Sequence, residues 1–270
     1  MASLRMCSIG DNTVDRYVDH GTWYPGGSAA NVAVHARRHG VDAGYIGIVG
    51  SDEASALVRD SLERESVDLS RLRSEPGPNA FTDIFLDAKG NRHFGEHSAP
   101  ESALHLDESD LEYLRGCDWI HTGHSSATES ELGTMARIAP VMFDFSHSSL
   151  EYAAPLLEHI TIAAFSRPEL SEAQCRDLLN EVCSHGATTA VVTRGAQSTI
   201  AWRGEFASEP AHEIAVVDTL GAGDAFLAAF AVNLMAGGTL ALALSAATGY
   251  AAKSCTHLGA YGHGVSAPSP

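Results

Sequence analysis

The chain has 270 residues, of which 44% are hydrophobic and 19% charged, so it is long enough to bury a sizeable core. Its 34 acidic and 17 basic residues give a formal net charge of −17, which disfavours binding to nucleic acids and to anionic membrane surfaces. No apolar run approaches the roughly 18 residues of a membrane-spanning helix, and the first residues show no secretory signal, so we expect a cytoplasmic protein.

Short apolar segments alternate with amphipathic ones along the chain. The apolar segments are rich in Val and Ile, which is typical of strands in a parallel sheet that is covered on both faces. In chain order, the predicted strands are 4–10, 43–50, 119–123, 141–145, 160–165, 188–193 and 199–202. The predicted helices are 28–38, 52–65, 108–115, 169–185, 222–235 and 241–255. This alternation predicts an α/β fold with helices on both faces of the sheet.

One segment interrupts the alternation. Residues 81–87 and 92–96 have strand character and flank an Ala-Lys-Gly-Asn turn, so we predict a β-hairpin there. A hairpin inserted into an α/β chain is expected to form a lid over an active site. The tail at 262–270 is rich in Gly, Ser and Pro, and we expect it to be loose. No linker divides the chain, so we predict one domain over residues 1–270.

The cysteines and histidines do not indicate disulfide bonds or a metal site. Five widely spaced cysteines without a Cys-x-x-Cys pair are typical of buried or incidental thiols in a reducing compartment. The pairs His35/His39 and His93/His97 have i, i+4 spacing, but neither has the glutamate of a His-Glu-x-x-His zinc motif. We therefore interpret these histidines as structural or solvated.

The strongest functional signal is the sequence Val-Val-Asp-Thr-Leu-Gly-Ala-Gly-Asp-Ala-Phe at 216–226, where a glycine-rich turn leads into an Ala-rich helix. Gly221 and Gly223 let backbone N–H groups approach a ligand closely, and a helix N-terminus favours an anion. Asp224 lies in the same turn, where a carboxylate can accept a proton from an attacking hydroxyl group. This combination suits phosphoryl transfer. An ordinary helix start with a first-turn acid also explains it.

Two further motifs lie near the N-terminus. Gly26 and Gly27 precede a predicted helix whose first turn carries Asn31, so backbone N–H groups and an amide converge, which suits a neutral polyhydroxylated ligand. Asp11 and Asp15 follow the first predicted strand, and open α/β sheets bind ligands at the carboxyl ends of their strands. A plain turn with a helix cap and a solvated loop are the respective alternatives.

These motifs occur in the order found in the ribokinase (PfkB) family of sugar kinases, which the chain resembles over roughly residues 4 to 260. The resemblance rests on the motifs at 10–15, 26–31, 193–195 and 218–226. The segments at 8–12, 92–95 and 143–146, together with the short length, look like those of fructoselysine 6-kinase and related fructosamine kinases within the family. The implied fold is a ribokinase-like three-layer α/β sandwich with a small β lid from about 16–25 and 79–97.

The resemblance also implies a reaction and its participants. The γ-phosphoryl group of ATP is transferred to the primary hydroxyl of a ketosugar-type substrate, with fructoselysine or another fructosamine as the favoured one. Mg²⁺ is the implied metal, and some relatives also use a monovalent cation such as K⁺, which here would lie near Asp218 and Thr219. The implied partners are therefore a small sugar and ATP, and a homodimer is compatible with the resemblance.

Individual residues acquire expected roles from the same resemblance. Asp224 is the expected catalytic base, and the backbone N–H groups of Gly221, Ala222 and Gly223 form the expected anion hole. The residues expected to bind the sugar substrate are Asp11, Asp15, Gly26, Gly27, Asn31 and Arg92. The residues expected to bind ATP or its counter-ions are Thr193, Arg194, Gly195, Asp218 and Thr219. Glu169 is expected to guide Mg²⁺ through water.

Two departures from the family pattern limit these expectations. The usual Asn-x-x-Glu sequence reads Ser-Arg-Pro-Glu at 166–169, so the metal arrangement is implied less closely than the base. The segment between Asp15 and Gly26 is short, so we expect a smaller lid and different contacts in any dimer. Other substrates stay open, namely a nucleoside, a plain hexose, ribose or a ketodeoxy sugar acid, as does a non-catalytic ligand sensor.

Overall fold

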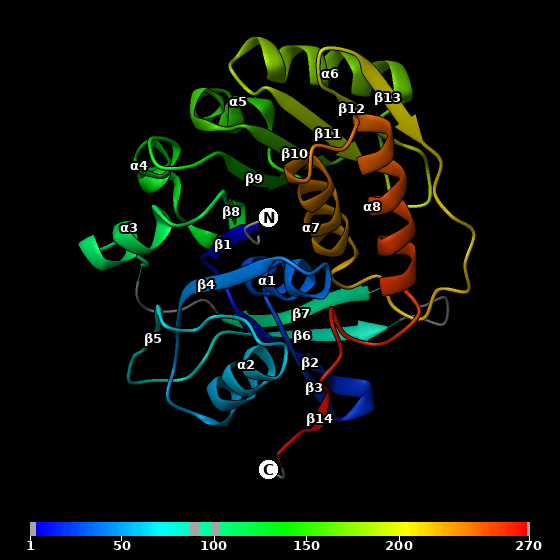
Figure 1. Cartoon of the computed structure of the whole chain (residues 1–270). Helices are drawn as coiled ribbons and strands as arrows, with labels where there is room; N and C mark the ends of the chain where they lie inside the picture. The colour runs from blue at the N-terminus through cyan, green and yellow to red at the C-terminus, as the bar shows by residue number, and fades with distance from the viewer. Residues whose placement is uncertain (1–3, 87–91, 99–102, 269–270) are drawn as a thin grey trace.

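A nine-stranded sheet forms the centre of the molecule (Figure 1). The structure is a computed structural model that describes residues 4–86, 92–98 and 103–268. The strands of the sheet are β1 (Arg5–Ile9), β4 (Asp42–Val49), β5 (Leu72–Ser74), β8 (Trp119–Gly123), β9 (Val141–Ser146), β10 (Ile162–Ser166), β11 (Thr189–Thr193), β12 (Thr199–Trp202) and β13 (Phe206–Glu209). Their order is β13-β12-β11-β10-β9-β8-β1-β4-β5, and only β12 and β13 pair in an antiparallel manner with the strand before them.

Helices cover both faces of this sheet. One face packs against α1 (Ser28–Arg38), α7 (Ala222–Met235) and α8 (Leu240–Ser254). The other packs against α3 (Glu108–Leu114), α4 (Leu132–Ala136), α5 (Leu150–Ala153) and α6 (Glu172–Ser184). Successive strand residues point to opposite faces, so Met6 enters the first core, and Cys7 and Ile9 enter the second. The predicted α/β architecture is confirmed.

A second sheet lies beside the central one (Figure 1). Its strands are β2 (Thr13–Tyr17), β3 (Thr22–Gly26), β6 (Phe81–Leu86), β7 (Arg92–Ser98) and β14 (Val265–Ser266), in the order β14-β3-β2-β6-β7. The predicted hairpin is present, because β6 and β7 pair in an antiparallel manner. Its turn at 88–91 lies outside the described residues. The segments predicted to form a lid, 16–25 and 79–97, therefore share one sheet.

The C-terminal tail corrects one expectation, because part of it is held in this sheet. Val265 and Ser266 pair with Trp23 and Thr22 of β3. The prediction of a loose tail was wrong for these two residues. An edge strand presents unpaired backbone groups to any extended neighbour, and the composition of the tail did not reveal that β3 offered such an edge.

The remaining helices are short, apart from α2 (Glu53–Arg64), which packs against α1 and β2. Within the described ranges, four 3₁₀ helices lie in the connections: η1 (Val18–His20), η2 (His124–Ser126), η3 (Glu129–Glu131) and η4 (Ala154–His159). Helix α6 begins later than predicted, because Ser171 is its N-cap and forms a capping box with Gln174 in the first turn. Among the described residues, no helix is long and apolar enough to cross a lipid bilayer.

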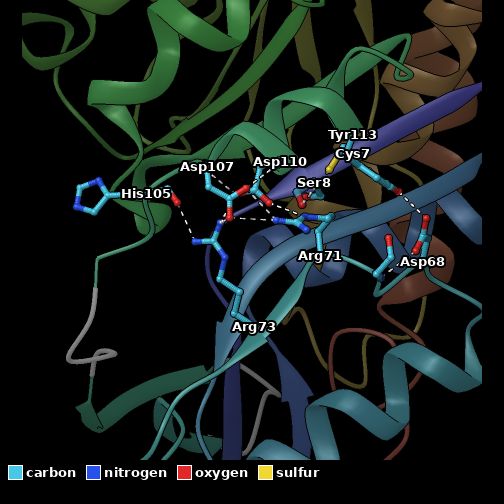
Figure 2. Close-up of polar contacts among 10 residues, drawn as sticks. Cys7, Ser8, Asp68, Arg71, Arg73, His105, Asp107, Asp110 and Tyr113 are labelled. Carbon is cyan, nitrogen blue, oxygen red and sulfur yellow. Dashed lines mark hydrogen bonds and ion pairs between the residues drawn. The ribbon is translucent and has the colours of Figure 1, made fainter.

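A charged network attaches the edge strand β5 to the start of α3. Figure 2 shows Arg71 and Arg73 both directed toward Asp107 and Asp110. The Asp110 side chain is fully buried and accepts hydrogen bonds from Arg71 Nε at 2.8 Å and from Arg73. Burying a carboxylate is costly unless it is paired, and here two guanidinium groups offset that cost.

Candidate active site

Several of the residues singled out in the sequence lie at one edge of the central sheet, where its parallel strands end. Asp11 follows β1, Gly123 ends β8, and Thr193 ends β11. These strands are part of the consecutive parallel run β11-β10-β9-β8-β1, so their carboxyl ends form one continuous row. Open α/β sheets bind ligands at this edge. The predicted motifs, distant in sequence, therefore lie in one region.

Asp224 lies where the N-termini of two helices meet. It belongs to the first turn of α7, and the first turn of α1 contributes two hydrogen bonds to its carboxylate. Ser28 Oγ donates to Asp224 Oδ1 at 2.8 Å, and Asn31 Nδ2 donates to Asp224 Oδ2 at 2.7 Å. Helix N-termini stabilise negative charge. The carboxylate is thus held in one orientation by groups that favour its ionised form.

Burial acts in the opposite direction. Removal from water raises the pKa of Asp224 from 3.8 to about 7, and the nearby carboxylates of Asp144 and Asp11 also raise it. The hydrogen bonds from Asn31 and Ser28 offset part of this increase in pKa. A general base is most effective when its pKa lies near the working pH. Asp224 therefore has the properties of a proton acceptor at neutral pH.

This pKa leads to a prediction about pH dependence. We expect kcat/KM to fall as the pH drops below about 7, because only the ionised Asp224 accepts a proton. The same raised pKa affects the free energy of unfolding. It stabilises the folded chain at low pH, and this contribution is lost as the pH rises from 3.8 to about 7. A pH–rate profile, with circular dichroism to confirm folding at each pH, tests this. A flat profile between about pH 5.5 and 8 contradicts it.

The two glycines of the turn before Asp224 lack a side chain for different local reasons. Gly221 has φ +71°, and a Cβ atom on it would lie 2.5 Å from the Cβ of Ala260. Gly221 is therefore required by the backbone and by packing. Gly223 lacks such neighbours, since a Cβ atom there would project into open space. Its missing side chain leaves room for a ligand above the first N–H groups of α7, which have no partner within the helix.

The glycine pair before α1 packs closely against β2 and its preceding loop. A Cβ atom on Gly26 would lie 2.1 Å from Asp15 Oδ2, and one on Gly27 would lie 2.4 Å from Asn12 Cα. Gly27 also has φ +100°, which favours glycine. The structure thus brings the buried Asp15 next to the start of α1. Contact of Asp15, Gly26 and Gly27 with a sugar stays a prediction.

Asp11 has a structural role at the N-terminus of α1. Its carboxylate accepts hydrogen bonds from the backbone N–H groups of Ser28, at 2.7 Å, and Ala29, at 3.2 Å, and from Ser126 Oγ at 2.8 Å. It therefore caps α1 from outside the helix and fixes the position of Ser28 beside Asp224. The solvated-loop alternative does not describe Asp11, whose carboxylate is engaged by α1 and Ser126, and its contact with a sugar stays a prediction.

Asn31 offers a hydrogen-bond acceptor to a ligand. Its amide nitrogen is committed to Asp224, and its Oδ1 atom is buried without a hydrogen-bond partner among the described residues. An unpaired buried acceptor is costly and rare in folded proteins. A hydroxyl group bound beside Asp224 would satisfy it. This orphan oxygen is the feature of the structure that fits a polyhydroxylated substrate.

The predicted ATP-binding residues lie at the end of β11. Thr193 is half-buried, and Gly195 has φ +60° with open space where a side chain would be. Arg194 is 7% exposed, and its guanidinium donates to Leu170 O, Gln197 Oε1 and Ser198 Oγ. Arg194 therefore holds its own loop together. Contact of these residues with ATP phosphates stays a prediction.

Asp218 is buried in the turn before α7. It accepts hydrogen bonds from Tyr17 Oη, from Leu220 N at 2.9 Å and from Gly259 N at 2.9 Å. The carboxylate thus joins three segments of the chain, which is a structural role that the sequence did not reveal. The predicted roles of Asp218 and Thr219 toward ATP or a monovalent cation stay predictions.

The residues expected to handle Mg²⁺ include an exposed carboxylate. The Glu169 side chain is 61% exposed and lies 3.9 Å from Arg167 Nε. The described residues contain no group of three or more His, Cys, Asp or Glu side chains that could hold a metal ion. Mg²⁺ that arrives with a nucleotide needs only one or two carboxylates besides phosphate and water, and the exposed carboxylate of Glu169 fits that requirement. The Arg92 side chain, expected to contact substrate, lies outside the described part of the chain.

The cysteines and the paired histidines differ in their burial. All five cysteines are free thiols. His35 is buried and lies 3.0 Å from the Tyr250 hydroxyl, while His93 and His97 are exposed on β7. Burial lowers the pKa of His35 to about 3, so it remains neutral.

Three residues of the site were not identified from the sequence. Asp144 lies near the carboxyl end of β9 in register with Gly123, and burial raises its pKa despite hydrogen bonds from Ser146. Ser28 holds Asp224, and Tyr17 holds Asp218. A carboxylate at a strand's carboxyl end was the available signal for Asp144. Nothing local marked the other two.

The sequence and fold are similar to those of known sugar kinases. A family profile described as pfkB family carbohydrate kinase matches residues 5–266. The chain is 38% identical over 267 residues to fructosamine kinase FrlD of Bacillus subtilis (strain 168), covering 97% of this chain and 94% of that one. It is 33% identical over 265 residues to fructoselysine 6-kinase of Escherichia coli (strain K12), covering 95% and 99%. Arabidopsis thaliana ribokinase complexed with ribose and ATP matches with a TM-score of 0.81 at 20% identity, covering 97% of this chain and 95% of that one. The predicted ribokinase-like fold is confirmed.

Proposed function

Because the chain belongs to the PfkB family of carbohydrate kinases, we propose that it transfers the γ-phosphoryl group of ATP to the 6-hydroxyl of a fructosamine such as fructoselysine. The observation that carries the reaction is the carboxylate of Asp224, which has a pKa of about 7 and lies beside an open anion-binding turn. The substrate class is supported by the similarity to the fructosamine kinase of Bacillus subtilis and the fructoselysine 6-kinase of Escherichia coli.

In this proposal each polar group of the site has one task. The substrate hydroxyl donates its proton to Asp224, whose orientation is set by Ser28 and Asn31. A second hydroxyl donates to the orphan Oδ1 of Asn31. The N–H groups of Gly221, Ala222 and Gly223 receive the transferred phosphoryl group, where negative charge is spread over its oxygens.

Mg²⁺ bound with ATP would supply positive charge to the phosphates, and Asp144 and Glu169 are the residues that would hold it through water. ATP itself would lie along the ends of β10 and β11, near Thr193 and Gly195. In this proposal the chain acts as one ribokinase-like domain over residues 1–270, and the second sheet forms its lid. A homodimer and activation by K⁺ stay predictions of the resemblance.

A substrate comparison tests this function. We expect kcat/KM with Mg·ATP to be at least about tenfold higher for fructoselysine than for fructose, ribose, adenosine or ketodeoxygluconate. Release of ADP measures the rate, and nuclear magnetic resonance of the product identifies the phosphorylated carbon. Turnover of only an unmodified sugar or a nucleoside contradicts the substrate. Binding of sugar without any release of ADP contradicts the kinase and favours the ligand sensor.

A further inference from the structure

Tyr17 connects the second sheet to the turn that precedes the anion-binding site. The residue ends β2, and its side chain is 2% exposed. Its hydroxyl donates to Oδ2 of Asp218, which lies 201 residues further along the chain and is 1% exposed. Burial and the adjacent carboxylate raise the pKa of the Tyr17 phenol, so it remains a hydrogen-bond donor.

Asp218 transmits this contact to the glycine turn. Its other oxygen, Oδ1, accepts a hydrogen bond from Leu220 N, and Oδ2 also accepts one from Gly259 N. Gly221 follows directly and rests against Ala260, the neighbour of Gly259. The turn is therefore held from three sides: by β2, by its own backbone and by the C-terminal segment. A buried carboxylate that loses one of its donors no longer has a single preferred position.

The same strand also carries the predicted sugar contact. Asp15 lies two residues before Tyr17 on β2, so both side chains point to the same face of the second sheet. Asp15 reaches the start of α1 at Gly26, while Tyr17 reaches the start of α7 through Asp218. One short strand therefore touches the surroundings of both helix N-termini that meet at Asp224.

We propose that Tyr17 is a positioning residue for phosphoryl transfer: by holding Asp218, it sets the anion-binding turn at 221–223 relative to the strand that contacts the sugar. The inference rests on the proposed function in two respects, namely that this turn receives the phosphoryl group and that β2 contacts the sugar. It assigns no contact between Tyr17 and substrate. Its effect is on the alignment of the turn, so it concerns the rate of transfer more than the affinity for sugar.

The substitution Tyr17→Phe tests this, because it removes only the hydroxyl group. We expect kcat to fall by about 10- to 100-fold, which is the equivalent of one hydrogen bond to a charged group. The KM for sugar should stay within about twofold of the wild-type value. Tyr24→Phe is the matched control. Tyr24 lies beside Tyr17 with ring centroids 5.0 Å apart, and in the described chain its hydroxyl donates no hydrogen bond to Asp218.

A binding experiment separates this inference from the substrate proposal. Kinetics are measured with whichever sugar the wild-type chain phosphorylates fastest, so failure of the fructosamine assignment does not affect the comparison. Calorimetry then compares ADP with ADP plus aluminium fluoride, a mimic of the transferred phosphoryl group, in the presence of Mg²⁺. We expect Tyr17→Phe to bind ADP with the affinity of the wild type. It should lose most of the additional affinity that aluminium fluoride gives the wild-type chain.

Three results would overturn the proposal. The first is an unchanged kcat in Tyr17→Phe together with an unchanged increase in ADP affinity on addition of aluminium fluoride. The second is an equal loss of kcat in Tyr24→Phe, which would indicate a general packing effect. The third is a rise in the KM for sugar at constant kcat, which would place Tyr17 in sugar binding. Thermal unfolding of both variants accompanies these measurements, because a purely structural role would lower stability and leave the kinetics intact.

Discussion

Replacing Asp224 by asparagine is expected to lower the single-turnover rate of phosphoryl transfer by about 10²- to 10⁴-fold, while sugar binding is largely kept. Asparagine has the size of aspartate but cannot accept a proton from the substrate hydroxyl. Its side-chain oxygen can still accept a hydrogen bond from Ser28 or Asn31, so the junction of α1 and α7 should persist. Rapid quench with radiolabelled ATP measures the transfer step, and calorimetry measures sugar binding.

The control for this substitution is Asp60→Asn, which makes the same chemical change on the exposed face of α2. It should leave the rate unchanged. Asp224→Asn should also remove the fall in rate below about pH 7, since that limb of the profile is assigned to its carboxylate. A wild-type rate in Asp224→Asn would eliminate this residue as the base, whatever the substrate.

Replacing Gly223 by alanine is expected to lower kcat by about 10²- to 10³-fold without loss of stability. The added methyl group enters the open space above the first turn of α7, where the phosphoryl group is proposed to lie. Alanine is a better helix former than glycine by about 1 kcal/mol, so the melting temperature should be unchanged or slightly higher. Steady-state kinetics and thermal unfolding of the same preparation give both quantities.

Gly221→Ala is the matched comparison, because its methyl group would collide with Ala260 instead of facing open space. With φ +71° and that contact, this variant should lose about 1–3 kcal/mol of stability as well as activity. The contrast between the two glycines is the test: full activity in a folded Gly223→Ala would show that the turn is not the phosphoryl site, and loss of stability in Gly223→Ala would contradict the open space at this position.

In the central sheet the partly exposed β5 and β13 were not predicted, and the other seven strands were predictable because they are buried on both faces along most of their length. Such strands are continuous apolar runs, and the segments at 119–123 and 199–202 matched β8 and β12 residue for residue. The strands β2 and β3 were not predicted. β2 carries Asp15 and Arg16, and β3 ends in Pro25 and Gly26, residues that locally favour turns. They are strands because they pair with each other and with β6 and β14.

The sequence predicted residues of the candidate site, but it did not predict the hydrogen-bond partners of their side chains. The motif at 218–224 pointed to Asp224 as the expected base and to residues 221–223 as the expected anion-binding turn, since glycines before a helix and an acid in its first turn have a local meaning. Arg194 was expected at ATP phosphates, yet its guanidinium is occupied by Leu170, Gln197 and Ser198. Side-chain partners of this kind depend on how loops fold back, and sequence order does not specify that.

The sequence by itself determined the net charge of −17, the order of seven central strands and six helices, the glycine-rich turn and the position of Asp224 at a helix start. Only the tertiary structure decided the protonation of Asp224, because exclusion of water and the proximity of Asp144 and Asp11 come from segments far along the chain. It also decided that the two glycines of the turn differ, through the contact of one with Ala260. Local conformation follows from neighbouring residues, whereas pKa values and the positions of catalytic groups follow from packing between distant segments.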